Sequence, residues 1–464
     1  MSLNPLILSR LQFGWVIGWH IMLPAFTVGL ASYIALVEIL NLVTGRQIYF
    51  RISTFWTKIF AVAFGMGVVS GVVMPFQFGT NWSRYSYATA NVLSPLFAYE
   101  ALTAFFLEAA FLGVLLFGRH LVPRWAHCVS ACMIAAGTLF SSFWILSANS
   151  WMQTPAGATL VDGRFEPTSW LAIIFNPSFP TRLGHTVVGF YISTAFVVLS
   201  VAAGYLLRER FVDEARRMLS MSLWLLMILV PLQIFLGDAS GLVTEQYQPA
   251  KLAAMEGDWQ TRPRMPLVLF AVPDQKDAAN HYAIEVPAAG SLILQHDPDA
   301  TVTGLDHFPR SDWPPVIVVF FSFRIMVGIG LLMLAIVVAG NALRQRGRVF
   351  SHRWLLQICR ASAPLGFIAV LAGWVTTEVG RQPWTVYHLL RTADSVTPSL
   401  TGWNVALSLA GYAVAYLIIY PSGLLVMAYL VRRGPSGTEQ RAPVEGGQPR
   451  SPTRPVAETT GDLR

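Results

Sequence analysis

Nine predominantly apolar stretches most constrain how this chain can fold, because each is long enough to cross the hydrocarbon core of a bilayer as a helix. They lie at residues 13–43, 54–78, 94–118, 125–149, 183–207, 217–237, 315–340, 354–378 and 402–431. Hydrophobic residues make up 54% of the 464 residues and charged residues only 12%. The sequence therefore predicts an all-α integral membrane protein with nine transmembrane helices.

Arginines in the short connecting segments favour one orientation of these helices. They are concentrated after the first, third, fifth and seventh spans, at Arg46, Arg51, Arg119, Arg124, Arg208, Arg210, Arg216, Arg217, Arg344, Arg346, Arg348 and Arg353. Connections on the other side carry fewer. Because basic short loops stay in the cytoplasm, we expect the N-terminus outside and the C-terminus in the cytoplasm.

The same pattern divides the chain into four parts. Residues 1–237 carry helices 1–6, and residues 315–433 carry helices 7–9. Residues 238–314 form a long external segment rich in Pro, Asp and Gln, and loops of this length are usually functional or disordered. Residues 434–464 contain few large apolar residues, which predicts a disordered cytoplasmic tail.

Several ionisable side chains lie inside the apolar stretches, where a charge costs about 2.5–3.5 kcal/mol on insertion scales. They are His20, Glu100, Glu108, His185, Arg324 and Glu378. Met326 follows Arg324 by two residues. Histidine and methionine are common axial ligands of haem iron. The pattern therefore indicates a membrane protein that holds redox metal centres.

Each of these residues also has a structural interpretation. A lone histidine in a helix is often a core residue, and Met326 could simply fill a packing gap. Arg324 could form an ion pair with Glu100 or Glu108. A secondary transporter would also place charges inside the membrane, at its substrate and coupling-ion sites. These alternatives remain open from the residues alone.

Eight ordered stretches carry a resemblance to a known family. They are Ser9-Arg10-Leu11-Gln12-Phe13, Phe76-Gln77-Phe78-Gly79-Thr80-Asn81-Trp82, Ala104-Phe105-Phe106-Leu107-Glu108, Trp151-Met152-Gln153, Gly237-Asp238-Ala239-Ser240-Gly241, Lys251-Leu252-Ala253-Ala254-Met255-Glu256, Phe323-Arg324-Ile325-Met326 and Gly380-Arg381-Gln382-Pro383-Trp384. With them, the chain resembles the large, haem-bearing subunit of cytochrome bd-type quinol oxidases. Its external segment, called the Q-loop in that family, is short, as in members similar to cyanide-insensitive oxidases.

The resemblance implies a set of iron ligands. His185 and Met326 correspond to the two axial ligands of a low-spin haem b, and Arg324 to an arginine that stabilises its reduced state. His20 and Glu378 correspond to ligands of two high-spin haems, in an order that the sequence leaves open. The implied cofactors are two haem b and a third haem that is either d or b.

Further roles follow from the same resemblance. Glu100 and Glu108 correspond to acidic residues that support ligation or deliver protons, and Ser141 to a hydroxyl on the proton route. Trp374 corresponds to an aromatic residue among the haems.

Lys251 and Glu256 correspond to residues that bind quinol, with ubiquinol as the expected substrate. From their charge and depth, we also expect Arg381 and Arg391 to pair with haem propionates.

The resemblance implies an electrogenic quinol:oxygen oxidoreductase in the bacterial inner membrane. Quinol would be oxidised at the external face, and dioxygen reduced with protons from the cytoplasm. The expected partners are a second polytopic subunit (subunit II), small single-span subunits and the bilayer, with no nucleic acid. The alternative within this class is a quinol-linked haem protein that passes electrons without reducing oxygen.

Overall fold

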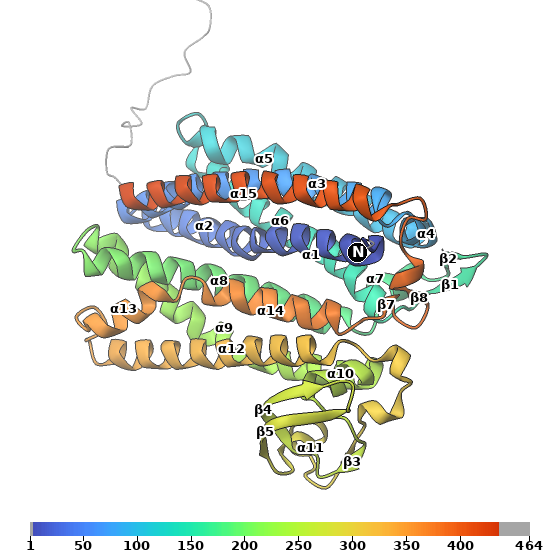
Figure 1. The fold of residues 1–464 in the computed structure, drawn as a ribbon. Helices are drawn as coiled ribbons and strands as arrows, with labels where there is room; N and C mark the ends of the chain where they lie inside the picture. The colour runs from blue at the N-terminus through green and yellow to red at the C-terminus, as the bar shows by residue number, and fades with distance from the viewer. Residues whose placement is uncertain (1–2, 436–464) are drawn as a thin grey trace, which may run out of the picture.

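The computed structural model describes residues 3–435, which contain nine helical spans long and apolar enough to cross a membrane (Figure 1). The spans are α1–α2 (Pro5–Met22 and Pro24–Thr44), α3 (Gln47–Thr80), α4–α5 (Ser83–Glu100 and Phe106–Phe117), α6 (Arg124–Gln153), α8 (Phe179–Leu207), α9 (Val212–Tyr247), α12 (Val316–Gln345), α13–α14 (Arg353–Ala361 and Leu365–Val379) and α15 (Gly402–Arg433). The predicted number of spans is confirmed. From residue 436 onward, the predicted tail at 434–464 lies outside the described residues.

Three spans are interrupted. The first breaks at Leu23, because Pro24 lacks a backbone N–H and starts a new helix there. In the third, the five-residue π-helix η1 (Ala101–Phe105) follows Glu100 directly, and the 3₁₀ turn η2 (Gly118–His120) ends the span. Pro364 precedes α14 in the eighth span. Single π-helical turns inside α-helices are frequent at functional sites.

Helix α2 lies at the centre of the bundle, where it packs against α3, α6 and α8. Gly29 allows α8 to come close, since a Cβ at this position would lie 2.4 Å from Thr194 Oγ1. The Thr194 hydroxyl donates a 2.9 Å hydrogen bond to the Phe26 carbonyl across this contact. Small residues are enriched where membrane helices approach closely, because packing and hydrogen bonds must replace the hydrophobic effect in lipid.

Helix α9 continues to Tyr247, although its apolar stretch ends at residue 237, where we expected the external segment to begin. The hydroxyls in this part bond back to the helix: Ser240 Oγ donates to the Leu236 carbonyl at 2.7 Å, and Thr244 Oγ1 to the Ser240 carbonyl at 2.8 Å. Apolar length alone therefore underestimates a helix whose last turns are polar and project beyond the bilayer.

The segment between α9 and α12 folds into a small unit at one end of the bundle (Figure 1). Its elements are α10 (Pro249–Glu256), β3 (Arg262–Pro263), β4 (Leu267–Asp274), β5 (Ala279–Val286), α11 (Ala289–Gln295), β6 (Thr301–Val302), η3 (Leu305–His307) and η4 (Arg310–Asp312). Strands β4 and β5 form an antiparallel pair, as do β3 and β6. Trp259, Met265 and Trp313 belong to the unit's own buried apolar cluster, so it has a core.

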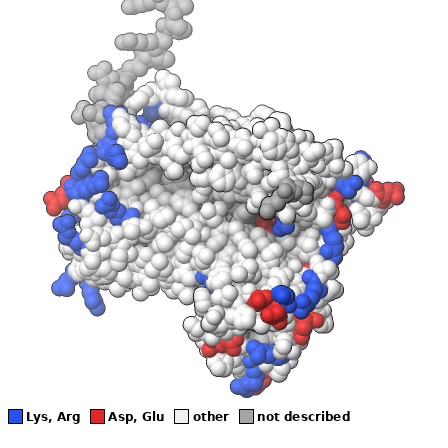
Figure 2. All heavy atoms as spheres, in the orientation of Figure 1, with Lys and Arg blue, Asp and Glu red and all other residues white. Residues whose placement is uncertain are grey.

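The same end of the bundle carries the other ordered connections (Figure 1). These are the antiparallel pair β1 (Ala158–Val161) and β2 (Arg164–Pro167), α7 (Trp170–Ile174), the pair β7 (Trp384–Val386) and β8 (Leu390–Arg391), and η5 (Thr392–Asp394). Figure 2 shows charged side chains gathered at the two ends of the molecule, with a band almost free of charge between them. Such a band is what a chain needs to face hydrocarbon.

A buried ion cluster ties four segments together at the opposite end of the bundle from α10. Glu38 of α2 is 2% exposed and accepts a hydrogen bond from Arg119 Nη2 at 2.7 Å and another from the Ser53 hydroxyl of α3. His127 Nδ1 of α6 lies 3.6 Å from the same carboxylate. Arg119 supplies the compensating cation and Ser53 a further donor, so the buried carboxylate has hydrogen-bond partners from two other segments.

We predict that Arg119→Leu destabilises the protein by about 3–5 kcal/mol, because it leaves the Glu38 charge buried without its closest cation. A thermal unfolding midpoint in detergent measures this loss. The exposed pair Arg264–Asp299, with side chains 66% and 69% exposed, offers a matched control: Arg264→Leu should change the midpoint little. Equal losses in the two variants would contradict the assignment.

Candidate active site

His20 lies on α1 and faces α3. Its Nδ1 is 2.9 Å from the hydroxyl of Ser70, which also donates to the Met66 carbonyl. Gly71 provides the space for the ring, since a Cβ at this position would lie 3.2 Å from His20 Cε1. The Ser70–Gly71 pair of α3 therefore fixes where the imidazole sits.

His185 of α8 lies against α9, close to Gln233 and Gly237. Its Nε2 is 3.2 Å from the Gln233 amide nitrogen, and a Cβ at Gly237 would lie 3.4 Å from its Cε1. Among the described residues, its Nδ1 is buried and has no hydrogen-bond partner. The Gln233 amide nitrogen can only donate, so Nε2 accepts and the proton of the neutral ring lies on Nδ1, which has no acceptor. A buried polar atom without a partner is costly, so the surroundings of this ring are incomplete without a further group.

Met326 of α12 lies against α14, at Gly373. A Cβ at Gly373 would lie 2.8 Å from the Met326 sulfur, so the glycine gives the sulfur its space beside α14. The neighbouring Trp374 is partly buried on the same helix.

Glu378 near the end of α14 receives three side-chain hydrogen bonds. Asn149 Nδ2 donates to its Oε1 at 2.8 Å, and Gln153 Nε2 donates to the same oxygen at 3.3 Å. Arg381 Nη2 donates to Oε2 at 2.5 Å. The Arg381 Nε and Nη1 atoms are buried and have no partner within residues 3–435. The guanidinium therefore retains donors for a second anionic group.

Lys251 of α10 is buried, with only 2% of its surface exposed, whereas we expected a polar anchor on an external loop. Its Nζ donates to Gln153 Oε1 and Gln248 Oε1, both at 2.6 Å. Its aliphatic stem lies on Gly380, where a Cβ would come within 2.8 Å of Lys251 Cγ. The folded unit turns α10 inward, which sequence position alone could not indicate.

The electrostatic surroundings of Lys251 oppose its charged form. Burial is the largest effect and holds the pKa of Lys251 well below its ordinary value. Arg182 and Arg381 lower it further, while Glu378 acts in the opposite direction. Burial therefore favours the uncharged amine of Lys251 at this position.

Arg324 of α12 forms an ion pair with Glu256, the last residue of α10, at 3.0 Å. Its Nε donates to the Val268 carbonyl of β4 at 3.1 Å, and its Nη1 donates to the Met255 carbonyl. The guanidinium also lies 4.0 Å from the centre of the Phe320 ring. The alternative pairing of Arg324 with Glu100 or Glu108 is thus wrong, because the Q-loop supplies its carboxylate.

Glu100 and Glu108 belong to a separate polar cluster between α4–α5 and α6. Ser141 Oγ donates to Glu100 Oε1 at 2.9 Å. Glu108 is 8% exposed and lies against Gly137, where a Cβ would come within 2.7 Å of its Cγ. The π-helix η1 separates the two glutamates along the chain.

Arg391 is engaged outside these clusters. It pairs with Asp312 at 2.5 Å and stacks over Trp384 at 4.4 Å, and its side chain is 37% exposed. Arg381 and Arg391 were both expected near haem propionates. Within residues 3–435, Arg381 has buried donors left for such a group, and Arg391 does not.

Sequence reasoning missed four polar residues at the site. Asn149, Gln153 and Gln248 connect the predicted residues, and Gln153 was quoted only as part of a matching stretch. Asp258, just after α10, is 4% exposed, and burial followed by repulsion from Glu256 raises its pKa well above the ordinary value. Neutral amides carry no signal in a search for charges in apolar segments, so only their contacts reveal them.

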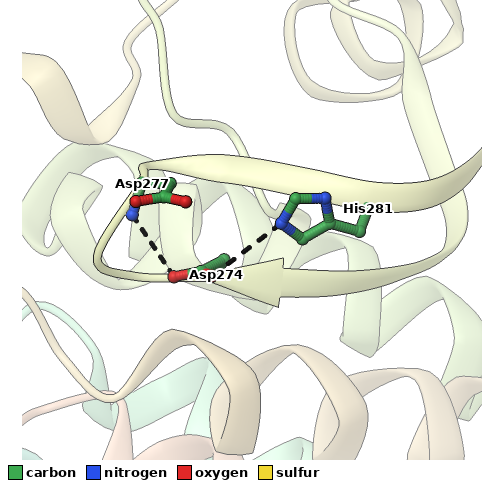
Figure 3. A group of neighbouring side chains, drawn as sticks. All are labelled: Asp274, Asp277 and His281. Carbon is green, nitrogen blue, oxygen red and sulfur yellow. Dashed lines mark hydrogen bonds and ion pairs between the residues drawn. The ribbon is translucent and has the colours of Figure 1, made fainter.

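A further group of possible cation ligands lies on the β4–β5 hairpin (Figure 3), where Asp274, Asp277 and His281 have ligand atoms within 4.8 Å of one another. Asp274 accepts hydrogen bonds from the backbone N–H groups of Lys276 and Asp277, which lower its pKa. His281 lies 3.8 Å from the same carboxylate. These contacts close the hairpin turn, and we assign the group a structural role.

The sequence matches the family model of cytochrome bd terminal oxidase subunit I over residues 8–435. It is 34% identical to the cytochrome bd-II ubiquinol oxidase subunit 1 of Escherichia coli (strain K12), over 94% of this chain and 98% of that relative. It is also 34% identical to the cytochrome bd ubiquinol oxidase subunit 1 of Bacillus subtilis (strain 168), over 94% and 95% of the two chains.

A second Bacillus subtilis relative, a putative cytochrome bd menaquinol oxidase subunit I, is 30% identical over 93% of this chain and 98% of its own. The fold is similar to that of the bd oxidase from Geobacillus thermodenitrificans, with a TM-score of 0.86, 29% identity, and coverage of 93% of this chain and 99% of that one. With nine membrane spans and a family match across nearly all the described residues, the chain belongs to the cytochrome bd terminal oxidase subunit I family.

Proposed function

We propose that this chain is the haem-bearing subunit of a terminal oxidase in the bacterial inner membrane, which oxidises quinol and reduces dioxygen to water. Its relatives are named ubiquinol and menaquinol oxidases. The observation that carries the proposal is one chain of buried contacts, within the family's fold, from Lys251 through Gln153 to Glu378. Family membership leaves the transporter interpretation without support.

The residues fit haem groups. His185 has a buried ring nitrogen without a partner, and the Met326 sulfur lies in the space that Gly373 leaves, so these two residues would hold the low-spin haem. His20 and Glu378 would hold the two high-spin haems, and the free donors of Arg381 would meet a propionate. We propose two haem b and a third haem that is d or b. When bound, these groups supply the electron transfer and the oxygen chemistry.

Helix α10 would form the quinol site, with residues 238–314 as the quinol-binding segment. Lys251 and Glu256 lie at its two ends, each held by a fixed partner. A quinol that becomes a quinone releases two electrons and two protons, and groups beside it must accept those protons. Burial favours the neutral amine of Lys251, which would accept one of these protons. Burial also favours the neutral carboxyl of Asp258, just after α10, which would donate a hydrogen bond to a quinol oxygen.

Reduction of dioxygen to two waters consumes four protons and four electrons. We propose that Glu108, Glu100 and Ser141 carry protons toward the oxygen site, because these polar side chains lie where α4–α5 and α6 meet, with Ser141 bonded to Glu100 and Glu108 buried. The arginine-rich end of the molecule would face the cytoplasm, as the positive-inside rule predicts. The protons would then cross part of the membrane and make the reaction electrogenic.

Membership in a subunit I family implies a complex with subunit II. The span α4–α5 exposes large apolar residues, including Leu102, Phe106 and Phe117 at 62%, 60% and 75%. This face is suited to lipid or to a second polytopic subunit. We further propose small single-span subunits as partners, with dioxygen as the electron acceptor.

A reduced-minus-oxidised absorption spectrum, together with oxygen uptake driven by quinol, tests the function. We expect b-type bands, with or without a red-shifted chlorin band, and oxygen consumption that depends on quinol. Haem bands without oxygen uptake would favour the electron relay. A folded complex without haem bands would overturn the proposal.

We predict that His185→Ala and Met326→Leu each abolish the low-spin haem b signal, because each removes one of the two residues that would hold this haem. The spectrum of the purified complex measures the loss. His281→Ala, at an exposed histidine of the hairpin, should leave the bands unchanged. Retention of the low-spin bands in both ligand variants would contradict the ligand assignment.

We predict that Lys251→Ala raises the quinol KM by about tenfold, since a hydrogen bond to a charged or readily charged group contributes roughly 1.5–3 kcal/mol. Haem content should change little. Lys276→Ala, at an exposed lysine of the same segment, is the control. A variant with normal KM and altered haem bands would argue against a quinol-binding role.

A further inference from the structure

Helix α10 packs against α12, which carries Met326, and its Lys251 reaches the end of α14 that carries Glu378. At its start, Lys251 points toward the Glu378 end of α14, through Gln153. At its end, Glu256 pairs directly with Arg324, two residues before Met326 on α12. The polar contacts at the two ends therefore differ, because Glu256 bonds directly to Arg324 whereas Lys251 reaches Glu378 through a neutral side chain.

Gln153, the last residue of α6, makes every contact in the indirect connection. Its Oε1 accepts hydrogen bonds from Lys251 Nζ at 2.6 Å and from Gln248 Nε2 at 3.0 Å. Its Nε2 donates to Glu378 Oε1 at 3.3 Å. Gln153 is 0% exposed, so bulk water cannot replace these hydrogen bonds.

The chemistry of these contacts calls for an amide. The Glu378 carboxylate needs a hydrogen-bond donor, and the Lys251 amine, which donates, needs an acceptor. A side chain that bridges them must carry both, as an amide does. Glutamate at this position would keep the acceptor for Lys251 but would set a second carboxylate against Glu378. Leucine would fill the space and make neither bond.

We propose that Gln153 is a positioning residue that couples the quinol-binding helix α10 to the Glu378 end of α14, so that occupancy of the quinol site changes the surroundings of the haem held there. This inference rests on the proposed function of Lys251 and Glu378. Coupling between two sites is reciprocal. The redox state of the haem held at Glu378 would therefore change the quinol affinity by the same factor. The direct Glu256–Arg324 pair would keep the low-spin side independent of Gln153.

The test titrates the high-spin haem bands of the purified complex, with and without a non-reducible quinone-headgroup analogue, in wild type, Gln153→Leu and Gln153→Glu. In wild type, the analogue should shift the midpoint potential. In Gln153→Leu, that shift should disappear and quinol KM should rise by about tenfold, with the low-spin bands unchanged. Gln153→Glu keeps an acceptor for Lys251, so its quinol KM should stay near the wild-type value. The analogue should still leave the midpoint potential of this variant unchanged.

Gln12→Leu is the matched control, because Gln12 is 1% exposed and bonds only to Ser408 among the described side chains. It should behave as wild type in both measurements. A purely structural role for Gln153 would make KM and the shift fail together in the glutamate variant. That result, or an analogue shift that persists in Gln153→Leu, would overturn the proposal.

If Gln153→Leu fails to assemble, Gln153→Glu by itself still tests the coupling. If Lys251→Ala leaves the quinol KM unchanged, the proposed quinol site itself is wrong. If Lys251→Ala raises KM while both Gln153 variants keep the wild-type shift, only the coupling is wrong.

Discussion

The cost of placing charge in a low-dielectric bundle governs this structure, because a buried charge is tolerated only where partners surround it. Glu38 is surrounded by Arg119, Ser53 and His127, and Glu378 by two amides and Arg381. These partners come from different helices. The polar contacts thus also fix which helices lie side by side, a role that apolar surfaces in lipid perform less specifically.

The unit between α9 and α12 shows how a soluble fold can serve a membrane site. Its apolar cluster continues onto Val316 and Val319 of α12, and this packing holds α10 with Lys251 and Glu256 turned into the protein. A flexible loop of equal length would lose conformational entropy each time it ordered around a substrate. The unit instead presents buried polar groups that are already oriented by Gln153, Gln248 and Arg324.

Several parts of the fold could be predicted because they depend on local properties of the chain. Apolar length predicted the nine spans, whereas the breaks before Pro24 and near Pro364, inside the predicted spans 13–43 and 354–378, were not predicted. The prediction failed at the end of α9, whose hydroxyl-bearing turns remain helical without being apolar. Candidate charges were found from their cost in hydrocarbon, whereas Gln153 and Asn149 carry no charge and gave no such signal.

The sequence by itself determined which residues must be inside the membrane and which of them need compensation, because hydrophobicity and charge are properties of single residues. Tertiary structure alone decided the pairs. Arg324 meets Glu256, 68 positions away, and Lys251 meets Gln153, 98 positions away. Partners so distant in sequence become neighbours only when helices pack, and the choice among possible carboxylates depends on the depth and direction of each side chain. For that reason the candidate ligands could be named from the sequence, and the connection between them could not.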